Sequence, residues 1–251
     1  MPMTRRDFVT IATGLSGTVG VALGAEPPAK STIKALAFDA FTVLDPRPVV
    51  ALAQELFPEE GAELSTEWRA RQFEYTWLRV AARQYADFWQ VSQEALVFAA
   101  KKIKLELGQD KRNKLMNAYL ELKAWPDAAP ALRSLKTSGF RLAFLSNFTP
   151  RMLAADIQSA GLVGVFEHAL STDQVRTYKP DPRAYQLGTD MLKLKREQIL
   201  FVAFAGWDAA GAKLFGYPTF WVNRLKLPME ELGATPDAAG ETLAELAQYL
   251  A

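Results

Sequence analysis

The chain has 251 residues, with 29 Lys plus Arg against 28 Asp plus Glu, a single His and no Cys. This length fits one large domain, or a core domain that carries a smaller one. The near-zero net charge provides no basic field to hold nucleic acid or an anionic membrane. The lack of Cys, with His168 as the sole His, excludes disulfides, thiol nucleophiles and multi-His zinc sites. We therefore expect any catalysis to use carboxylates, Lys, Arg and hydroxyls.

The N-terminal residues have the pattern of a targeting signal. Arg5 and Arg6 precede Phe8 and a weakly apolar, glycine-interrupted run over 11–25, which resembles a twin-arginine export signal. The run is too short to be a comfortable membrane span. We expect a signal peptide over 1–25 and a periplasmic protein, with no membrane contact beyond the export machinery. Cleavage after residue 24 or 25 and an uncleaved tail remain open alternatives.

The first structured segment is expected at 33–38, an apolar run that ends at Asp39 and suits a buried parallel strand. From residue 46 to 126 the apolar spacing becomes helical, with no segment that indicates a strand. Ser92 and Asp110 are expected as helix N-caps in this block, and the second of these helices is expected to run through Leu122.

Strands and helices alternate after Pro126, which indicates an α/β fold. The expected elements are helices over 127–136, 150–160, 182–193 and 208–215, and strands over 141–146, 168–171, 199–204 and, last, 219–222. We predict a Rossmann-like parallel sheet flanked by helices, with a helical cap inserted after the first strand. The core then comprises 32–45 and 127–251, and the cap comprises 46–126.

Polar residues follow four of the predicted strands. Asp39, Ser146 with Asn147, Lys179 and Asp208 lie at or just beyond strand ends, where open parallel sheets bind their ligands. Each residue has a plainer explanation as a turn residue, a helix cap or a solvated amine. Four such positions at successive strand ends favour an active site.

These residues also carry a family resemblance. Phe38-Asp39, Ser146-Asn147, Lys179-Pro180 and Asp208 resemble the four motifs of the haloacid dehalogenase superfamily. Longer segments are similar to the type II (S)-2-haloacid dehalogenases: WRARQFEYTWLR at 68–79, KPDPRAY at 179–185, GWDAAGA at 206–212 and WVNR at 221–224. The resemblance covers nearly the whole chain from residue 33 onward.

The resemblance implies a covalent mechanism without a cofactor or a metal. Asp39 would be the nucleophile that attacks the halogen-bearing carbon, inverts it and forms an ester. Lys179 would keep Asp39 ionised, because a nearby opposite charge favours the charged form. Arg69, from the cap, would hold the departing halide.

The remaining site residues are assigned by the same resemblance. Ser146 and Asn147 would lie near the substrate carboxylate, and Tyr185 near Lys179 and the leaving group. Asp208 would position Lys179 and the water that hydrolyses the ester. The expected apolar lining, which desolvates the nucleophile or simply belongs to the core, is Phe41, Phe73, Phe88 and Trp207.

Three positions depart from the family pattern. Val43 stands where the family has Thr, and Ala203 and Ala205 stand where it has Ser and Asn. Losing one buried hydrogen-bond partner costs about 1–3 kcal/mol, so three losses slow catalysis by orders of magnitude unless other groups substitute.

Three functions therefore stay open at this stage. The first is a dehalogenase that acts on a small carboxylic acid, and the second is a binding or vestigial protein with this fold. The third is a Mg-dependent phosphatase, which needs a second Asp where this chain has Phe41. The resemblance also suggests a homodimer, with the aromatic cap as an interface.

Overall fold

The computed structural model describes residues 32–251. The predicted signal peptide over 1–25 lies outside the described residues. None of the described helices combines the length and apolar character needed to cross a membrane.

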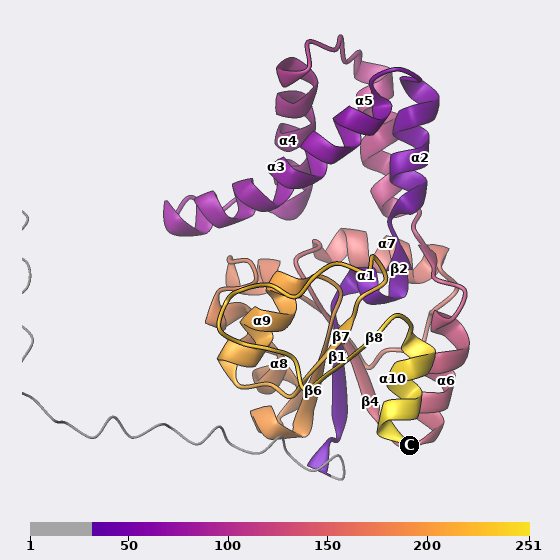
Figure 1. Cartoon of the computed structure of the whole chain (residues 1–251), viewed down its shortest axis with the longest axis vertical. Helices are drawn as coiled ribbons and strands as arrows, with labels where there is room; N and C mark the ends of the chain where they lie inside the picture. Colours follow the sequence, from indigo (N-terminus) through magenta and orange to yellow (C-terminus); the bar gives the residue numbers. More distant parts are fainter. Residues whose placement is uncertain (1–31) are drawn as a thin grey trace, which may run out of the picture.

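A six-stranded parallel sheet forms the centre of the fold, as predicted (Figure 1). Each neighbouring pair of strands is parallel, and β1 lies between β4 and β6. The strands, in spatial order, are β5 (His168–Ser171), β4 (Arg141–Ser146), β1 (Ala35–Phe38), β6 (Ile199–Ala203), β7 (Thr219–Val222) and β8 (Ala238–Gly240). The short, fully buried β1 has apolar residues on both faces, as parallel strands covered on both sides require.

Successive residues of β1 pack into different layers, because side chains alternate across a strand. Leu36 and Phe38 join a cluster with α6 (Ala128–Thr137), α7 (Pro150–Ser159) and α10 (Leu243–Leu250). Ala35 and Ala37 join a second cluster with α8 (Pro182–Leu192) and α9 (Gly206–Phe215). The sheet is therefore covered by helices on both faces, and its ligand-binding edge is the end where the strands finish.

Four cap helices stand over that end of the sheet (Figure 1). The short α1 (Ala40–Val43) follows β1 directly and leads into the cap through β2 (Leu44–Asp45). The chain returns through β3 (Lys123–Ala124), which pairs antiparallel with β2. The cap helices are α2 (Arg47–Leu56), α3 (Gly61–Ala81), α4 (Phe88–Lys102) and α5 (Gln109–Asn117). Both connections between cap and core thus pass through one two-stranded ribbon.

Several sequence-based expectations in the cap were wrong. Ser92 lies inside α4, and the N-cap of this helix is Asp87. The buried hydroxyl of Ser92 accepts a hydrogen bond from the side-chain amide of Gln72. Asp110 lies in the first turn of α5, which is capped by Gly108 and ends at Asn117 rather than Leu122. The block also contains a strand, β3, despite the helical spacing around it.

Two expectations in the core also need correction. The strand over 219–222 is not the last, because β8 follows and pairs with it, and α10 comes after. The helix expected to start at Asp208 begins at Gly206, with Ala205 at its N-cap. Asp208 therefore lies in the first turn, where its carboxylate also interacts favourably with the helix dipole.

Candidate active site

The side chain of Lys179 joins the two predicted acidic site residues. Its Nζ atom lies 2.8 Å from Asp39 Oδ1 and 2.6 Å from Asp208 Oδ2. The Lys179 and Asp208 side chains are each 1% exposed, whereas Asp39 is 14% exposed. The ammonium group is thus withdrawn from solvent, and Asp39 is the one member of the trio that a ligand can approach.

Burial and charge act in opposite directions on these groups. Burial lowers the pKa of Lys179, but the neighbouring carboxylates of Asp208 and Asp39 outweigh it and the net pKa is raised. Burial raises the pKa of Asp208, against the opposing effect of Lys179. Lys179 therefore stays protonated, and it supplies the positive charge that lets two carboxylates lie close together.

Local backbone geometry orients Asp39. The residue follows β1 and acts as the N-cap of α1, with Oδ2 accepting a hydrogen bond from the backbone N–H of Phe41 at 3.0 Å. Its other carboxylate oxygen remains for Lys179. A side chain bonded through both oxygens loses little further rotamer freedom when it reacts, which favours a fixed direction of attack.

The two polar residues at the end of β4 have separate partners: Asn147 bonds the backbone of Lys179, and Ser146 bonds that of Phe148. Asn147 Oδ1 accepts hydrogen bonds from the backbone N–H of Lys179 at 3.0 Å and from the Thr172 hydroxyl at 3.2 Å. Ser146 Oγ accepts from the backbone N–H of Phe148 at 3.1 Å, so its own proton is free to be donated elsewhere. Both residues border the space in front of Asp39.

That space is a small chamber of about 20 Å³. Its walls contain all four predicted apolar residues, together with Asp39, Arg69, Ser146, Asn147 and Asp208. The structure thus brings together most of the site that the sequence predicts. The lining also includes three residues to which sequence reasoning gave no lining role, Phe148, Phe204 and Ala205.

Arg69 reaches the chamber from α3 of the cap. Within the described residues its guanidinium makes no hydrogen bond or ion pair, and its nearest aromatic partner is Phe204, at 5.8 Å from the ring centroid. A cation held among aromatic rings without a counterion is available to an anion. Its charge also offsets the excess negative charge of Asp39, Lys179 and Asp208 together.

Tyr185 bonds the same carboxylate as Lys179, the residue near which it was expected. Its hydroxyl donates to Asp208 Oδ1 at 2.7 Å, and it belongs to the buried cluster beneath the site rather than to the chamber lining. Burial, followed by the charge of Asp208, raises the pKa of Tyr185 well above its usual value. The tyrosine therefore stays a neutral donor that holds Asp208 in place.

The three positions that depart from the family pattern, 43, 203 and 205, carry apolar side chains. Val43 and Ala203 are fully buried, and Ala205 lines the chamber at the N-cap of α9. Thr42, next to Val43, directs its hydroxyl to the backbone oxygen of Asp39 at 2.6 Å, away from the carboxylate. The segment before Asp208 thus provides no side-chain hydrogen-bond donor at positions 203–205.

Comparisons with known proteins agree with this geometry. Residues 33–216 match the family model described as haloacid dehalogenase-like hydrolase. The chain belongs to this family. The match includes Asp39, Lys179 and Asp208, and with them the whole of the charged trio.

Two relatives match most of the length of this haloacid dehalogenase-like hydrolase. It is 44% identical over 82% of its length to an (S)-2-haloacid dehalogenase of Pseudomonas sp. (strain YL), of which the match covers 89%. It matches the crystal structure of the L-2-haloacid dehalogenase RSc1362 with a TM-score of 0.86 and 43% identity, over 87% of this chain and 98% of that one.

A third relative was solved with a covalently bound ligand. The L-2-haloacid dehalogenase of Xanthobacter autotrophicus with covalently bound chloropropionic acid matches with a TM-score of 0.81 and 32% identity. The match covers 87% of this chain and 98% of that one. The predicted resemblance to the (S)-2-haloacid dehalogenases is therefore confirmed.

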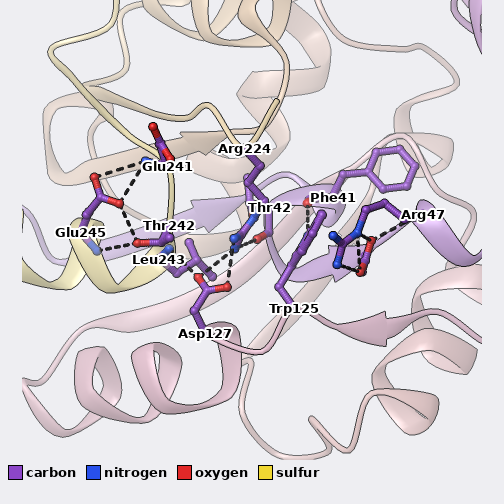
Figure 2. Close-up of polar contacts among 11 residues, drawn as sticks. Phe41, Thr42, Arg47, Trp125, Asp127, Arg224, Glu241, Thr242, Leu243 and Glu245 are labelled. Atoms are coloured by element: carbon purple, nitrogen blue, oxygen red, sulfur yellow. Dashed lines mark hydrogen bonds and ion pairs between the residues drawn. The ribbon is translucent and has the colours of Figure 1, made fainter. Parts of the chain in front are cut away.

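In this haloacid dehalogenase-like hydrolase, a clamp formed by Trp125, Asp127 and Arg224 holds α1, the short helix that follows Asp39 (Figure 2). Trp125 Nε1 donates to the backbone oxygen of Phe41 at 3.0 Å, and Arg224 donates to that of Thr42 at 2.9 Å. Arg224 also forms a two-point ion pair with Asp127. Sequence reasoning found Arg224 as part of a motif but gave no signal for this role, because its partners lie 97 and 182 residues away.

Within residues 32–251, no three His, Asp or Glu side chains are grouped so that they could hold a metal ion. The two acidic residues of the site instead share the ammonium of Lys179. The site therefore suits a reaction in which the Lys179 ammonium provides the positive charge.

Proposed function

We propose that this protein hydrolyses (S)-2-haloacids to 2-hydroxy acids of inverted configuration, through an ester of Asp39 and without a metal. The observation that carries the proposal is the Lys179 ammonium between Asp39 and Asp208, with Arg69 unpaired across the same chamber. The likeness to (S)-2-haloacid dehalogenases supports the substrate class.

The first step is a displacement at C2 of the acid. A carboxylate oxygen of Asp39 forms a bond to this carbon while the carbon–halogen bond breaks, and the halide leaves with both bonding electrons toward Arg69. The Ser146 hydroxyl, whose proton is free, is placed to donate to the substrate carboxylate. The apolar walls exclude water, which strengthens these charge interactions.

The second step hydrolyses the ester. Water adds to the carbonyl carbon of the Asp39 ester, and the bond between this carbon and the ester oxygen attached to C2 breaks. That oxygen leaves with C2 as the hydroxyl of the 2-hydroxy acid, the Asp39 carboxylate is regenerated, and one proton is released. Asp208, fixed by Lys179 and Tyr185, lies at the end of the chamber where this water is needed. Ala203 and Ala205 offer no side-chain hydrogen bond to this water. We therefore expect hydrolysis of the ester to be the slower step.

Two other functions compete with this proposal. The apolar residues Val43, Ala203 and Ala205 favour a binding protein with little turnover. A Mg-dependent phosphatase has less support, because Phe41 stands at the position of its general acid and cannot protonate a leaving alcohol.

One assay separates the three functions. Halide release from (S)-2-chloropropionate is measured with and without EDTA, next to phosphate release from an aryl phosphate with Mg²⁺. We expect EDTA-insensitive halide release that disappears in an Asp39→Asn variant with unchanged folding. Mg-dependent phosphate release would identify a phosphatase, and the absence of both products would identify a binding protein.

We also propose export by the twin-arginine route and a homodimer. Export is supported by Arg5-Arg6 and the run that follows, and an Arg5-Arg6→Lys-Lys variant is expected to keep the precursor in the cytoplasm. Unchanged periplasmic delivery of that variant would refute the export proposal. The dimer is supported by Trp77, Leu78 and Phe98, which are exposed on the cap, and sedimentation equilibrium tests it.

A further inference from the structure

A second cavity, of about 70 Å³, lies against the Asp39 chamber. The two spaces share four wall residues, Phe41, Arg69, Phe73 and Phe204. Beyond them the cavity extends between the cap and the core to a mouth at Val50 and Leu225, which are 40% and 43% exposed. A group attached to a ligand in the chamber therefore has an adjoining space to occupy.

The side chains that line this cavity determine which chemical groups it can bind. The cavity is lined mainly by apolar and aromatic side chains. Apart from Arg69, which lies on the wall shared with the chamber, the polar side chains deeper in it are already engaged. Trp68 Nε1 donates to the Ser92 backbone oxygen, the Gln72 amide donates to the Ser92 hydroxyl, and Ser65 donates to the Gly61 oxygen. A polar occupant would lose its hydrogen bonds to water without replacing them, whereas an apolar group loses none.

One wall of the cavity is held in a fixed position. Trp125 lines it and is held from either side by guanidinium groups, Arg47 at 4.4 Å and Arg224 at 4.6 Å from the ring centroid (Figure 2). Its indole N–H is fixed on the Phe41 backbone oxygen. Because the ring cannot turn into the cavity without breaking these contacts, the space is preformed rather than opened by a ligand.

We propose that this side cavity binds an alkyl group on C2 of the substrate, so that the enzyme prefers 2-haloacids with a chain of about four carbons over the methyl compound. The inference rests on the proposed function and names its substrate class. One water-sized occupant needs about 10–15 Å³. The 70 Å³ of the side cavity thus accommodates several heavy atoms, whereas the 20 Å³ of the chamber accommodates few.

The test compares (S)-2-chlorohexanoate with (S)-2-chloropropionate, which differ by three methylene groups. Burial of each methylene favours binding about threefold to fourfold, so we expect kcat/KM to be roughly 30-fold higher for the longer acid. The variant Val50→Trp/Leu225→Trp narrows the cavity from its mouth and is expected to reduce this ratio about tenfold. Leu227→Trp is the control, since Leu227 is also exposed, at 53%, but does not line the cavity.

A binding measurement keeps the test independent of turnover. Hexanoate and propionate carry no halogen, and calorimetric titration of the wild-type protein gives their affinities directly. We expect hexanoate to bind at least tenfold more tightly, and the difference to be lost in Val50→Trp/Leu225→Trp but kept in Leu227→Trp.

Each outcome has a defined meaning. No halide release together with the expected binding ratio would refute the proposed reaction and support the cavity. Halide release at equal efficiency from both acids, with equal binding of hexanoate and propionate, would refute the cavity. Equal slowing of both substrates in the narrowed variant would identify the cavity as an entry route and overturn the proposal.

Discussion

The two sides of the Asp39 chamber are organised differently. On the core side, Asp39, Lys179, Asp208 and Tyr185 form a continuous chain of hydrogen bonds. On the cap side, Arg69 has aromatic neighbours and, within the described residues, no hydrogen-bonding partner. The charges of the core side are therefore paired within the protein, whereas Arg69 on the cap side is available to pair with a bound anion.

Because of this difference, we expect substitutions on the two sides to differ in their effects on stability and on activity. Loss of the Lys179 ammonium leaves two carboxylates without their cation and should affect both folding and catalysis. A change at Arg69 removes a group that holds nothing else in place, and it should affect catalysis alone. The following experiments test this contrast in order of decreasing effect.

Replacement of Lys179 should have the largest effect. A Lys179→Met variant leaves Asp39 and Asp208 buried together without a cation, a loss of about 3–5 kcal/mol. We expect kcat/KM to fall by about 1000-fold or more and the free energy of unfolding to decrease as well. Lys213→Met, which removes a more exposed ion pair with Asp237, is the control. Activity within tenfold of wild type would contradict the role assigned to the core side.

Replacement of Arg69 tests the cap side. An Arg69→Gln variant loses the charge that stabilises the departing halide, worth about 2–4 kcal/mol in comparable sites. We expect halide formation to slow by about 100-fold with an unchanged melting temperature. Arg71→Gln, on the same helix but paired with Glu74, is the control for a general effect on the cap. A marked drop in the melting temperature of Arg69→Gln would show that Arg69 is also structural.

Asp156 shows what a buried carboxylate does without a neighbouring cation. Its Oδ1 accepts from the Leu122 backbone N–H, Oδ2 has no partner among the described residues, and burial raises its pKa to about 8. The folded state thus binds this proton more tightly than the unfolded state, and stability falls as the pH rises from about 4 through about 8.

An Asp156→Asn variant removes this titration. At about 1.4 kcal/mol per unit of pKa difference, the stability gained by the variant should grow by roughly 2–3 kcal/mol between pH 5.5 and pH 8.5. Urea unfolding at the two pH values measures it, with Asp190→Asn at an exposed carboxylate of α8 as control. A gain that does not depend on pH would show that Asp156 is ionised in the folded protein.

Restoration of polar groups before Asp208 should have the smallest effect and act on one step. We expect the wild-type enzyme to release a burst of halide equal to the enzyme present and then to turn over slowly, with the acyl group on Asp39 in mass spectra. The variant Ala203→Ser/Ala205→Asn should raise the steady-state rate about tenfold and the burst rate less. Ala169→Ser, at an exposed position on β5, is the control. A linear time course with no adduct would contradict this account.

Local sequence determined most of the fold. Strands over 141–146, 168–171 and 219–222 and the helices between them were predictable, because a buried parallel strand needs an uninterrupted apolar run and helices end at Gly or Pro. The site followed from topology, since the ends of parallel strands meet at one edge. The assignment of roles to Asp39, Lys179 and Arg69 needed the family resemblance in addition.

Tertiary contacts decided the remainder. The sequence Ala-Ala-Gly at 238–240 has no strand signal and becomes β8 because the edge of β7 is available to pair with it. Ser92 suits an N-cap by itself, yet Gln72, 20 residues away, engages its hydroxyl inside a helix. Trp125 and Arg224 hold α1, which contributes Phe41 to the wall of the side cavity, through partners 84 to 182 residues away. The local sequence pattern indicates whether a residue is buried. A hydrogen-bond partner so distant along the chain comes within reach only once the chain has folded.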